Sequence, residues 1–190
     1  RLIPITDAVP KAMVPLNGKP IIEYQVRWMQ SQGVTDVIFL TGYLGEKIER
    51  HFGDGSAFGI ISHYSHEDTP LGRGGAIRKG LTMVPPCERT VLVTNGDNIT
   101  DLDLSLLVQR HESSGAIATM MLTRYPSQFG VVEVGDDNLI KCFKEKGMLP
   151  IWINAGVYLF DRAIETILPG VGDHETSTFP ELLKQRKLAA

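Results

Sequence analysis

Hydrophobic positions along the chain alternate between two spacings. Ile21, Ile22, Val26 and Met29 recur at intervals that place them on one face of a helix. Val37 to Leu40 is a continuous apolar run of strand length, as in a strand covered on both faces. The same alternation predicts further strands at 60–64, 90–94, 116–122, 130–134, 139–143 and 153–160, and helices at 44–52, 75–83, 104–112, 162–168 and 179–187. Strands that alternate with helices predict an α/β protein with a mostly parallel central sheet.

Residues 1–20 show neither spacing. Pro4, Pro10, Pro15 and Pro20 remove backbone donors and restrict φ, so this segment is expected to be an extended loop rather than a helix. The rest of the chain contains no linker, internal repeat or low-complexity tract. A single domain over residues 1–190 is therefore predicted.

Composition restricts the classes of partner. The 190 residues carry 19 Lys and Arg against 22 Asp and Glu, a net charge of −3. This balance argues against a protein that binds nucleic acid or a membrane surface, so any polyanion must meet local cations. No apolar run reaches the ~18 residues of a membrane span. Cys87 and Cys142 fit no metal-ligand or redox spacing, which indicates reduced thiols in a cytoplasmic protein.

Polar residues that follow buried strands are the candidates for a site, because ligands of such sheets bind beyond the carboxyl ends of the strands. Asn95, Gly96 and Asp97 directly follow the strand at 90–94. Mg²⁺ takes one or two protein carboxylates plus phosphate oxygens, so a carboxylate beside a glycine suits it here. An Asx turn is the alternative explanation of the same residues.

Three other segments carry candidate chemistry, each with an ordinary structural alternative. Arg1 and Lys11 bear cations suited to phosphate, although solvated surface charges are the more common use of such residues. A glycine-rich turn at 70–76 precedes a helix whose amides could face a nucleotide, but it is neither a Walker loop nor a dinucleotide fingerprint. Residues 144–146 and 154–156 offer lysine, glutamate and asparagine at neighbouring strand ends, either for a sugar phosphate or as an ordinary charged edge.

These segments also occur in a recognisable order. Residues 1–20 contain the patterns R-L-x-P-x-T, P-K-x-M-x-P and G-K-P. The later motifs are Pro70-Leu71-Gly72, Asn95-Gly96-Asp97, Phe129-Gly130-Val131-Val132, Glu145-Lys146 and Asn154-Ala155-Gly156-Val157-Tyr158. Together they resemble the sugar-1-phosphate nucleotidyltransferase family over nearly the whole chain. The resemblance implies a Rossmann-like three-layer fold with a mostly parallel, mixed central sheet. It also implies the transfer of a nucleotidyl group to a hexose or heptose 1-phosphate, with release of pyrophosphate.

The resemblance also implies roles for individual residues. Arg1 and Lys11 would grip the triphosphate as catalytic residues, and Asp97 would bind Mg²⁺. The implied nucleotide-binding residues are Glu67, Gly72, Asn95 and Gly96, and the implied sugar-phosphate-binding residues are Gly130, Glu145, Lys146 and Asn154. The implied partners are a nucleoside triphosphate and a sugar 1-phosphate, with no nucleic acid and no membrane. The sequence leaves the oligomeric state open, a homo-oligomer included.

The sequence departs from the family pattern in four places. A glycine-rich G-x-G-T should precede Arg1, and a late strand with a second metal-binding aspartate should follow the last predicted helix. Both are absent, so the chain is expected to be truncated at both ends of the family domain and poorly active by itself. Arg73 stands where threonine or alanine is usual, and Gly147 stands where proline is usual.

Glu67 is the residue that bears on the choice of nucleotide. It lies five residues before Gly72, at the position that resembles the family's base-reading residue. A carboxylate only accepts hydrogen bonds and guanine presents adjacent N–H donors, whereas thymine and uracil would suit a glutamine better. The run Glu67-x-x-Pro70-Leu71-Gly72 also resembles mannose- and heptose-phosphate guanylyltransferases. The sequence therefore favours GTP, with a solvent-facing Glu67 as the alternative, and the sugar cannot be read from it.

Other functions compete with this interpretation. Within the family, the alternative is a glucose-1-phosphate thymidylyl- or uridylyltransferase. A non-catalytic nucleotide-sugar-binding regulatory module of the same fold has no chemical need for all four of Arg1, Lys11, Asp97 and Lys146. A metal-dependent glycosyltransferase needs a D-x-D pair after a strand. Asp101-Leu102-Asp103 has that pattern, but the start of a helix explains it better.

Overall fold

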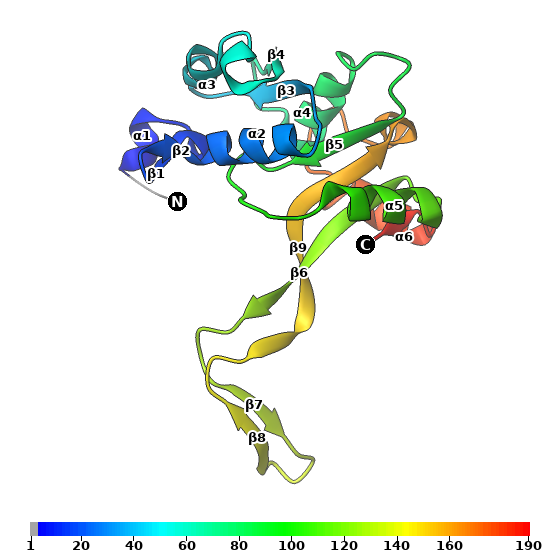
Figure 1. The fold of residues 1–190 in the computed structure, drawn as a ribbon. Coiled ribbons are helices and arrows are strands. Elements are labelled where there is room, and N and C mark those ends of the chain that lie inside the picture. The colour runs from blue at the N-terminus through cyan, green and yellow to red at the C-terminus, as the bar shows by residue number, and fades with distance from the viewer. Residues whose placement is uncertain (1–3) are drawn as a thin grey trace.

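A computed structural model describes residues 4–190 (Figure 1). Arg1, which the resemblance assigns to the triphosphate, lies outside these residues. The helices are α1 (Ile5–Ala8), α2 (Ile21–Ser31), α3 (Gly45–Phe52), α4 (Gly72–Leu81), α5 (Leu104–Ser114) and α6 (Thr178–Lys184), with 3₁₀ turns η1 (Lys11–Met13), η2 (Ser56–Phe58) and η3 (Arg162–Thr166). The strands are β1 (Pro15–Leu16), β2 (Lys19–Pro20), β3 (Asp36–Thr41), β4 (Ile61–His66), β5 (Thr90–Thr94), β6 (Ala118–Pro126), β7 (Val131–Val134), β8 (Ile140–Lys144), β9 (Met148–Asp161) and β10 (Leu188–Ala189).

β9 is one of the two inner strands of a four-stranded sheet, whose order is β10-β6-β9-β5. It pairs antiparallel with both β5 and β6, while β6 pairs parallel with β10. β3 and β4 form a separate parallel pair. The predicted α/β class with a mixed sheet is confirmed. The parallel share is smaller than the sequence predicts, because the spacing of apolar residues carries no information about strand direction.

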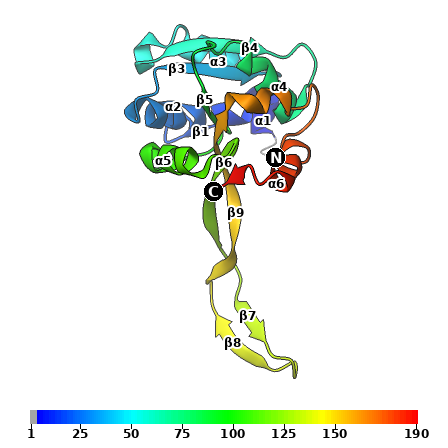
Figure 2. The ribbon, with the colours of Figure 1, turned by 90° about the vertical axis from the view of Figure 1, so that its right-hand side faces the viewer.

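Alternate side chains of β9 face two different cores. Val157 and Leu159 pack in the cluster that includes side chains of α2, α3 and α5, whereas Tyr158 and Phe160 pack with α4, η3 and α6. This division follows from the period of two along a strand. Figure 2 shows α2 and α5 on one side of the sheet and α4 and α6 on the other. The two cores produce the predicted three-layer arrangement.

The helices are short, and several have one buried face. α2 is the clearest case, because its buried face carries Ile22, Val26 and Met29, as the spacing in the sequence predicts. The chain then leaves the helix through Gly33, whose φ of +87° favours glycine. Over residues 4–190, no helix combines the length and the apolar character that crossing a membrane demands.

The expectation of an extended loop for residues 1–20 is wrong in part. Between the prolines the chain forms two short helical turns, α1 and η1, followed by the β1–β2 hairpin. Pro4 and Pro10 lie immediately before these turns, where a missing N–H costs nothing and the restricted φ suits helix initiation. Frequent proline therefore limits the length of the helices here without preventing them.

Residues 123–153 form an arm that projects from the body of the molecule (Figures 1 and 2). The arm contains the outer parts of β6 and β9 and the two-stranded β7–β8 hairpin. Large apolar side chains are exposed along it, namely Phe129, Val132, Val134, Leu139, Ile140, Phe143, Met148, Ile151 and Trp152. An isolated two-stranded ribbon has little stability in water, so the fold rests on the two cores and not on the arm.

His174 is a titratable side chain inside the second core. Its ring lies edge-on to Tyr158, Phe160 and Phe179, and neither ring nitrogen has a hydrogen-bond partner among the described residues. The carboxylate of Asp173 lies 3.7 Å from Nδ1, which is too long for a hydrogen bond. Burial lowers the pKa of His174 from its ordinary value of 6.5, so the folded protein holds this ring neutral.

We expect the free energy of unfolding to decrease as the pH falls below 6.5, because the unfolded chain binds a proton that the buried ring does not. One such histidine contributes a slope of about 1.4 kcal/mol per pH unit while the folded ring stays neutral. Urea unfolding across this pH range measures the slope. His174→Phe should flatten it, leaving the parts due to His111, whose pKa burial also lowers, and to carboxylates such as Glu23 and Asp173, whose pKa values are lowered as well. His63, which is partly exposed and pairs with Asp36 at the surface, serves as the control position. Equal slopes for wild type and His174→Phe would contradict the interpretation.

Candidate functional site

Lys11 and Asp97 form an ion pair at the carboxyl end of β5. Lys11 comes from η1, whereas Asp97 follows β5 along the chain. The side chain of Asp97 is 26% exposed and that of Lys11 is 62% exposed, so the pair lies where a ligand can reach it. Two residues that the resemblance assigns to the triphosphate and to the metal are therefore neighbours.

Gly96 brings the loop after β5 close to η1 and α2. A Cβ atom at Gly96 would lie 3.3 Å from Cβ of Ala12 and 3.5 Å from Cδ1 of Ile22, so a larger side chain would push the loop away. Ala12 directly follows Lys11 in η1. The small residue at position 96 thus allows the contact that places the Lys11 ammonium beside the Asp97 carboxylate.

The same loop is fixed to β9 by backbone and side-chain hydrogen bonds. The amide of Asn95 donates to the carbonyl oxygen of Gly156 at 3.1 Å, and Asn98 Nδ2 donates to the carbonyl oxygen of Ala155 at 2.6 Å. Gly156 has a φ of +72°, and a Cβ atom there would lie 2.5 Å from the Nδ2 atoms of Asn95 and Asn98. The Asn95-Gly96-Asp97 and Asn154-Ala155-Gly156 motifs, distant in sequence, therefore meet at one edge of the sheet.

The side chain of Asn154 is held by its neighbours. Its Nδ2 donates to the hydroxyl of Tyr158 at 2.7 Å and to Oε1 of Glu175 at 2.9 Å, and its Oδ1 accepts from the amide of Gly156 at 2.9 Å. The Tyr158 hydroxyl donates to the same Glu175 oxygen at 3.0 Å. Burial raises the pKa of Tyr158 to about 12, so the phenol keeps its proton at neutral pH.

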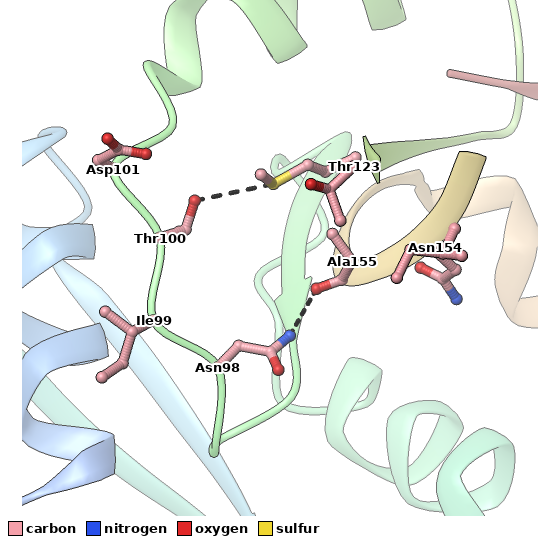
Figure 3. Close-up of a pocket in the computed structure, with 9 residues that line it drawn as sticks. Asn98, Ile99, Thr100, Asp101, Thr123, Asn154 and Ala155 are labelled. Atoms are coloured by element: carbon pink, nitrogen blue, oxygen red, sulfur yellow. Dashed lines mark hydrogen bonds between the residues drawn. The ribbon is translucent and has the colours of Figure 1, made fainter. Parts of the chain in front are cut away.

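An open cavity of about 420 Å³ lies beside this junction (Figure 3). It is lined by residues 98–101 after β5, by Met121 and Thr123 of β6, and by residues 153–155 of β9. Small-molecule sites commonly have volumes in this range and combine apolar walls with a few polar groups. Here the residues with polar side chains are Asn98, Thr100, Asp101, Thr123 and Asn154.

Asp97 is the carboxylate that stands where a metal would meet a phosphate. Among residues 4–190, no group of three or more His, Cys, Asp or Glu side chains is arranged to hold a metal ion. A single exposed carboxylate at a strand end fits Mg²⁺ when phosphate and water oxygens complete the coordination shell. It does not fit a metal caged by protein alone.

The acidic pattern that follows this loop has a structural role. Asp103 accepts from the amide of Ser105 at 2.9 Å and so caps α5. The predicted helix start is therefore confirmed for Asp103, the second carboxylate of Asp101-Leu102-Asp103. Asp101 instead lines the cavity, so the two carboxylates do not act as one pair.

The glycine-rich segment that leads into the first turn of α4 packs against a loop of the same chain. The amides of Gly74 and Gly75 donate to the carbonyl oxygen of Gly172 at 2.9 and 3.4 Å. Those two amides are consequently engaged within the protein. Gly72 has a φ of +73° and lies in an exposed position, and Oε2 of Glu67 accepts from the amide of Leu71 at 2.6 Å. Glu67 and Gly72 are thus joined in one turn.

The remaining sugar-phosphate residues lie on the arm. Gly130 and Glu145 are adjacent, since a Cβ atom at Gly130 would lie 3.5 Å from Oε2 of Glu145. Lys146 follows in the turn between β8 and β9. Asn154 lies six residues beyond Met148, where β9 begins, which is about 20 Å of extended strand. The structure therefore groups Gly130, Glu145 and Lys146 together but does not bring them to Asn154 or Asp97.

Glu175 is a candidate site residue that the sequence did not indicate, and Arg73 stood out there only as a departure from the family pattern. Arg73 donates to Glu175, a residue more than a hundred positions later, and Glu175 contacts Asn154. A pairing across that separation leaves no local spacing to detect. The available signal was the pair of acidic residues Asp173 and Glu175 on either side of His174, shortly before a helix with a buried face.

Residues 1–189 match the nucleotidyl transferase family, and the chain belongs to this family. It is 38% identical to a D-glycero-alpha-D-manno-heptose 1-phosphate guanylyltransferase of Aneurinibacillus thermoaerophilus, over 86% of this chain and 71% of that protein. It is 32% identical to a UTP–glucose-1-phosphate uridylyltransferase of Synechocystis, over 96% of this chain. The chain spans about half of that relative, at 52% of its length.

The fold is also similar to that of solved structures. The crystal structure of HddC from Yersinia pseudotuberculosis complexed with GMP-PN superimposes with a TM-score of 0.73 over 95% of this chain and 80% of that one. Sequence identity is 23%, so the comparison concerns the fold. It agrees with the Rossmann-like arrangement that the resemblance implied.

The close approach of Gly156 to the two asparagines leads to a prediction. Gly156→Ala should lower the free energy of unfolding by about 1–3 kcal/mol more than Gly33→Ala, because only at position 156 does the new methyl group overlap other atoms. Gly33 is the matched control, since it also has a positive φ but nothing within 4 Å of the added Cβ. Urea unfolding of both variants measures the difference, and equal losses would contradict the described packing.

Proposed function

We propose that this site transfers a nucleotidyl group from a nucleoside triphosphate, with GTP favoured, to a hexose or heptose 1-phosphate. The observation that carries the proposal is the pairing of Lys11 with Asp97 beside Gly96, at the strand end where this fold binds ligands. Membership of the nucleotidyl transferase family supports it. The uridylyltransferase relative supports the alternative, a glucose-1-phosphate uridylyl- or thymidylyltransferase.

In the proposed reaction, an oxygen of the sugar phosphate attacks the α-phosphorus of the triphosphate and forms the new P–O bond. The bond between the α-phosphorus and its bridging oxygen breaks, and pyrophosphate leaves with the electron pair. The attacking oxygen is already ionised at neutral pH, so no general base is needed. The protein contributes positioning and stabilisation of charge.

Repulsion between the two substrates is the main obstacle. Two unit charges of the same sign about 4 Å apart cost about 4 kcal/mol at an effective dielectric constant of 20. Lys11 supplies a cation at this point, and its partly exposed ammonium is free to move from Asp97 to a phosphate oxygen. We assign the same task to Arg1, which lies outside the described residues.

Asp97 would hold a Mg²⁺ ion that also contacts the phosphates. The ion would supply positive charge where negative charge accumulates. In its presence Lys11 and Asp97 would separate, with the carboxylate turning to the metal and the ammonium to the triphosphate. Asn95 and Gly96, which hold this loop against β9 and α2, would keep both groups at the nucleotide.

Glu67 is our candidate for recognising the base. Its Oε2 is engaged by the amide of Leu71, which fixes the carboxylate and leaves Oε1 to accept from guanine N–H groups. The guanylyltransferase relative and the nucleotide named in the Yersinia structure support a preference for GTP. We also assign Gly72, at the other end of the same turn, to the nucleotide, which its exposed backbone could contact on the side away from Gly172.

Gly130, Glu145 and Lys146 would reach the sugar phosphate through movement of the arm. The three residues lie close together on the arm, so they would reach the sugar phosphate as one unit. Asn154, on the wall of the cavity, would contact the sugar ring. The free thiols of Cys87 and Cys142 support our placing of this reaction in the reducing cytoplasm.

Release of pyrophosphate by the full-length protein with Mg²⁺ tests the proposal. GTP, UTP, dTTP, CTP and ATP are each paired with mannose, glucose and heptose 1-phosphates. We expect release in one or a few pairings that include GTP. If the folded protein releases no pyrophosphate in any pairing, the proposal is overturned and a non-catalytic binding module is favoured.

Removal of the Lys11 ammonium should slow this reaction. We expect Lys11→Ala to lower kcat/KM by about 10²–10³, the range seen when one charge-stabilising donor is lost from a transition state. The matched control is Lys184→Ala, which removes an exposed lysine that pairs with Glu181 on α6. Steady-state kinetics of both variants give the comparison, and equal activity of Lys11→Ala and wild type would contradict the assignment.

The choice of nucleotide should depend on Glu67. Glu67→Gln should reduce kcat/KM for GTP relative to UTP by about tenfold, because an amide replaces one acceptor with a donor that opposes the guanine N–H groups. The ratio of kcat/KM for the two nucleotides is measured for wild type and variant. An unchanged ratio would mean that Glu67 only shapes the turn through Leu71.

A further inference from the structure

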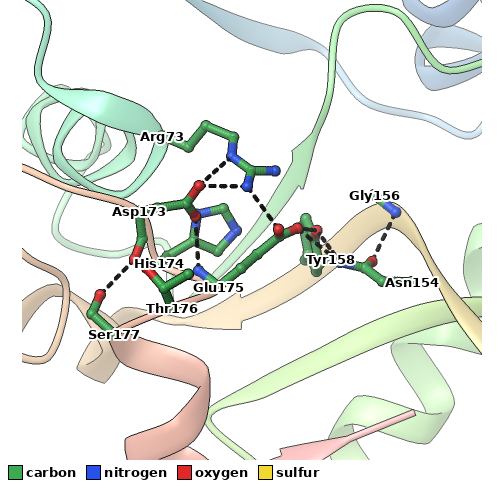
Figure 4. Close-up of polar contacts among 9 residues, drawn as sticks. All are labelled: Arg73, Asn154, Gly156, Tyr158, Asp173, His174, Glu175, Thr176 and Ser177. Carbon is green, nitrogen blue, oxygen red and sulfur yellow. Dashed lines mark hydrogen bonds and ion pairs between the residues drawn. The ribbon is translucent and has the colours of Figure 1, made fainter.

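Glu175 joins two parts of the molecule that the proposed reaction uses separately (Figure 4). Its Oε2 accepts from Nη2 of Arg73 at 2.7 Å, on the nucleotide side, where Arg73 directly follows Gly72. Its Oε1 accepts from Asn154 at 2.9 Å and from the Tyr158 hydroxyl at 3.0 Å, on the sugar side. One carboxylate therefore bridges α4 and β9.

These bonds use the donors of Asn154 completely. An amide group has two N–H donors and an oxygen with two lone pairs. Tyr158 and Glu175 take the donors, and the amide of Gly156 takes one lone pair of Oδ1. A flipped amide would place Oδ1 against the Glu175 carboxylate. The side chain consequently has one orientation, and the remaining lone pair of Oδ1 is what it can offer to a ligand, as a hydrogen-bond acceptor.

Glu175 is itself held in place by charge. Arg73 Nε donates to Oδ2 of Asp173 at 2.8 Å, so the guanidinium spans both carboxylates. Asp173 Oδ1 accepts from the amide of Glu175 at 2.9 Å, which closes the loop around the pair. The bond to Asp173 raises the pKa of Arg73, so the cation persists at any working pH. The side chains of Arg73, Asp173 and Glu175 are 47%, 30% and 29% exposed. The network is therefore partly open to solvent and can be reached by a ligand.

We propose that Glu175 is a positioning residue, which orients Asn154 so that it accepts a hydrogen bond from a hydroxyl of the sugar. Through its ion pair with Arg73, Glu175 is also connected to the nucleotide-binding turn. This inference rests on the proposed function. A carboxylate is required because it accepts on both sides at once. A glutamine in its place presents an N–H₂ group either to Arg73 or to Asn154, both of which are donors, and so breaks one of the two connections.

The test compares Glu175→Gln in two backgrounds in the full-length protein. In the wild-type background we expect the KM for the sugar 1-phosphate to rise about tenfold with kcat changed less than about twofold, the effect of losing one hydrogen bond to an ionised group. Asn154→Ala should raise the same KM. In the Asn154→Ala background, Glu175→Gln should add nothing, because the group through which it acts is gone.

Matched controls separate positioning from general stability. Glu181→Gln makes the same chemical change on α6, where the carboxylate contacts Lys184 of the same helix and Gln185 directly after it, and it should leave KM unaltered. Arg73→Thr should reproduce part of the Glu175→Gln effect. The side-chain amide protons of Asn154, assigned by their loss in Asn154→Ala, should shift upfield in Glu175→Gln and stay unchanged in Glu181→Gln.

The outcomes distinguish this inference from the proposed function. If wild type transfers nucleotide and Glu175→Gln raises KM equally in both backgrounds, the positioning role is overturned and the proposed function stands. If wild type releases no pyrophosphate in any pairing, the proposed function fails, and the Asn154 amide signals then decide whether Glu175 orients that side chain. Unshifted amide signals in Glu175→Gln would overturn the inference in either case.

Discussion

The pairing of β5 with β9 is the interaction on which the fold and the site both depend. Its register runs from Thr90↔Asp161 to Thr94↔Val157 and continues as a backbone bond between Asn95 and Gly156. Along that register β9 divides its side chains between the two cores. Where the pairing ends, the segment after β5 and the preceding part of β9 separate, and the cavity lies between them. The geometry that buries the apolar residues is therefore also the geometry that exposes Asp97.

Charge at the site is arranged so that it can be redistributed. Lys11 and Asp97 neutralise each other across a contact that stays partly exposed, so exchanging partners with a phosphate and a cation requires little desolvation. The network around Glu175 has the opposite character. There Arg73 and the buried phenol of Tyr158 fix the carboxylate from two sides. One part of the site is thus suited to accept charged ligands and the other to hold a neutral amide still.

Local patterns in the sequence predicted much of this structure. The strand at 90–94, the helix beginning at Ile21 and the cap at Asp103 follow from spacing and residue type within a few positions. The position of Asp97 at the sheet edge follows from the strand before it. The antiparallel direction of β9 and the contact of Arg73 with Glu175 depend on packing between distant segments, which no local pattern records. The arm was also missed, because its alternating residues predict strands without showing that they leave the body.

The central claim is that a metal–nucleotide complex binds at Asp97, Lys11 and the loop after β5 that is fixed to β9. Its most direct measurement is a crystal structure of the full-length protein with GTP and Mn²⁺ in place of Mg²⁺, with the metal located by anomalous scattering. The account predicts a metal peak at bonding distance from the Asp97 carboxylate and a triphosphate oxygen within reach of Lys11. A bound nucleotide whose metal and phosphates lie away from the end of β5 would contradict it.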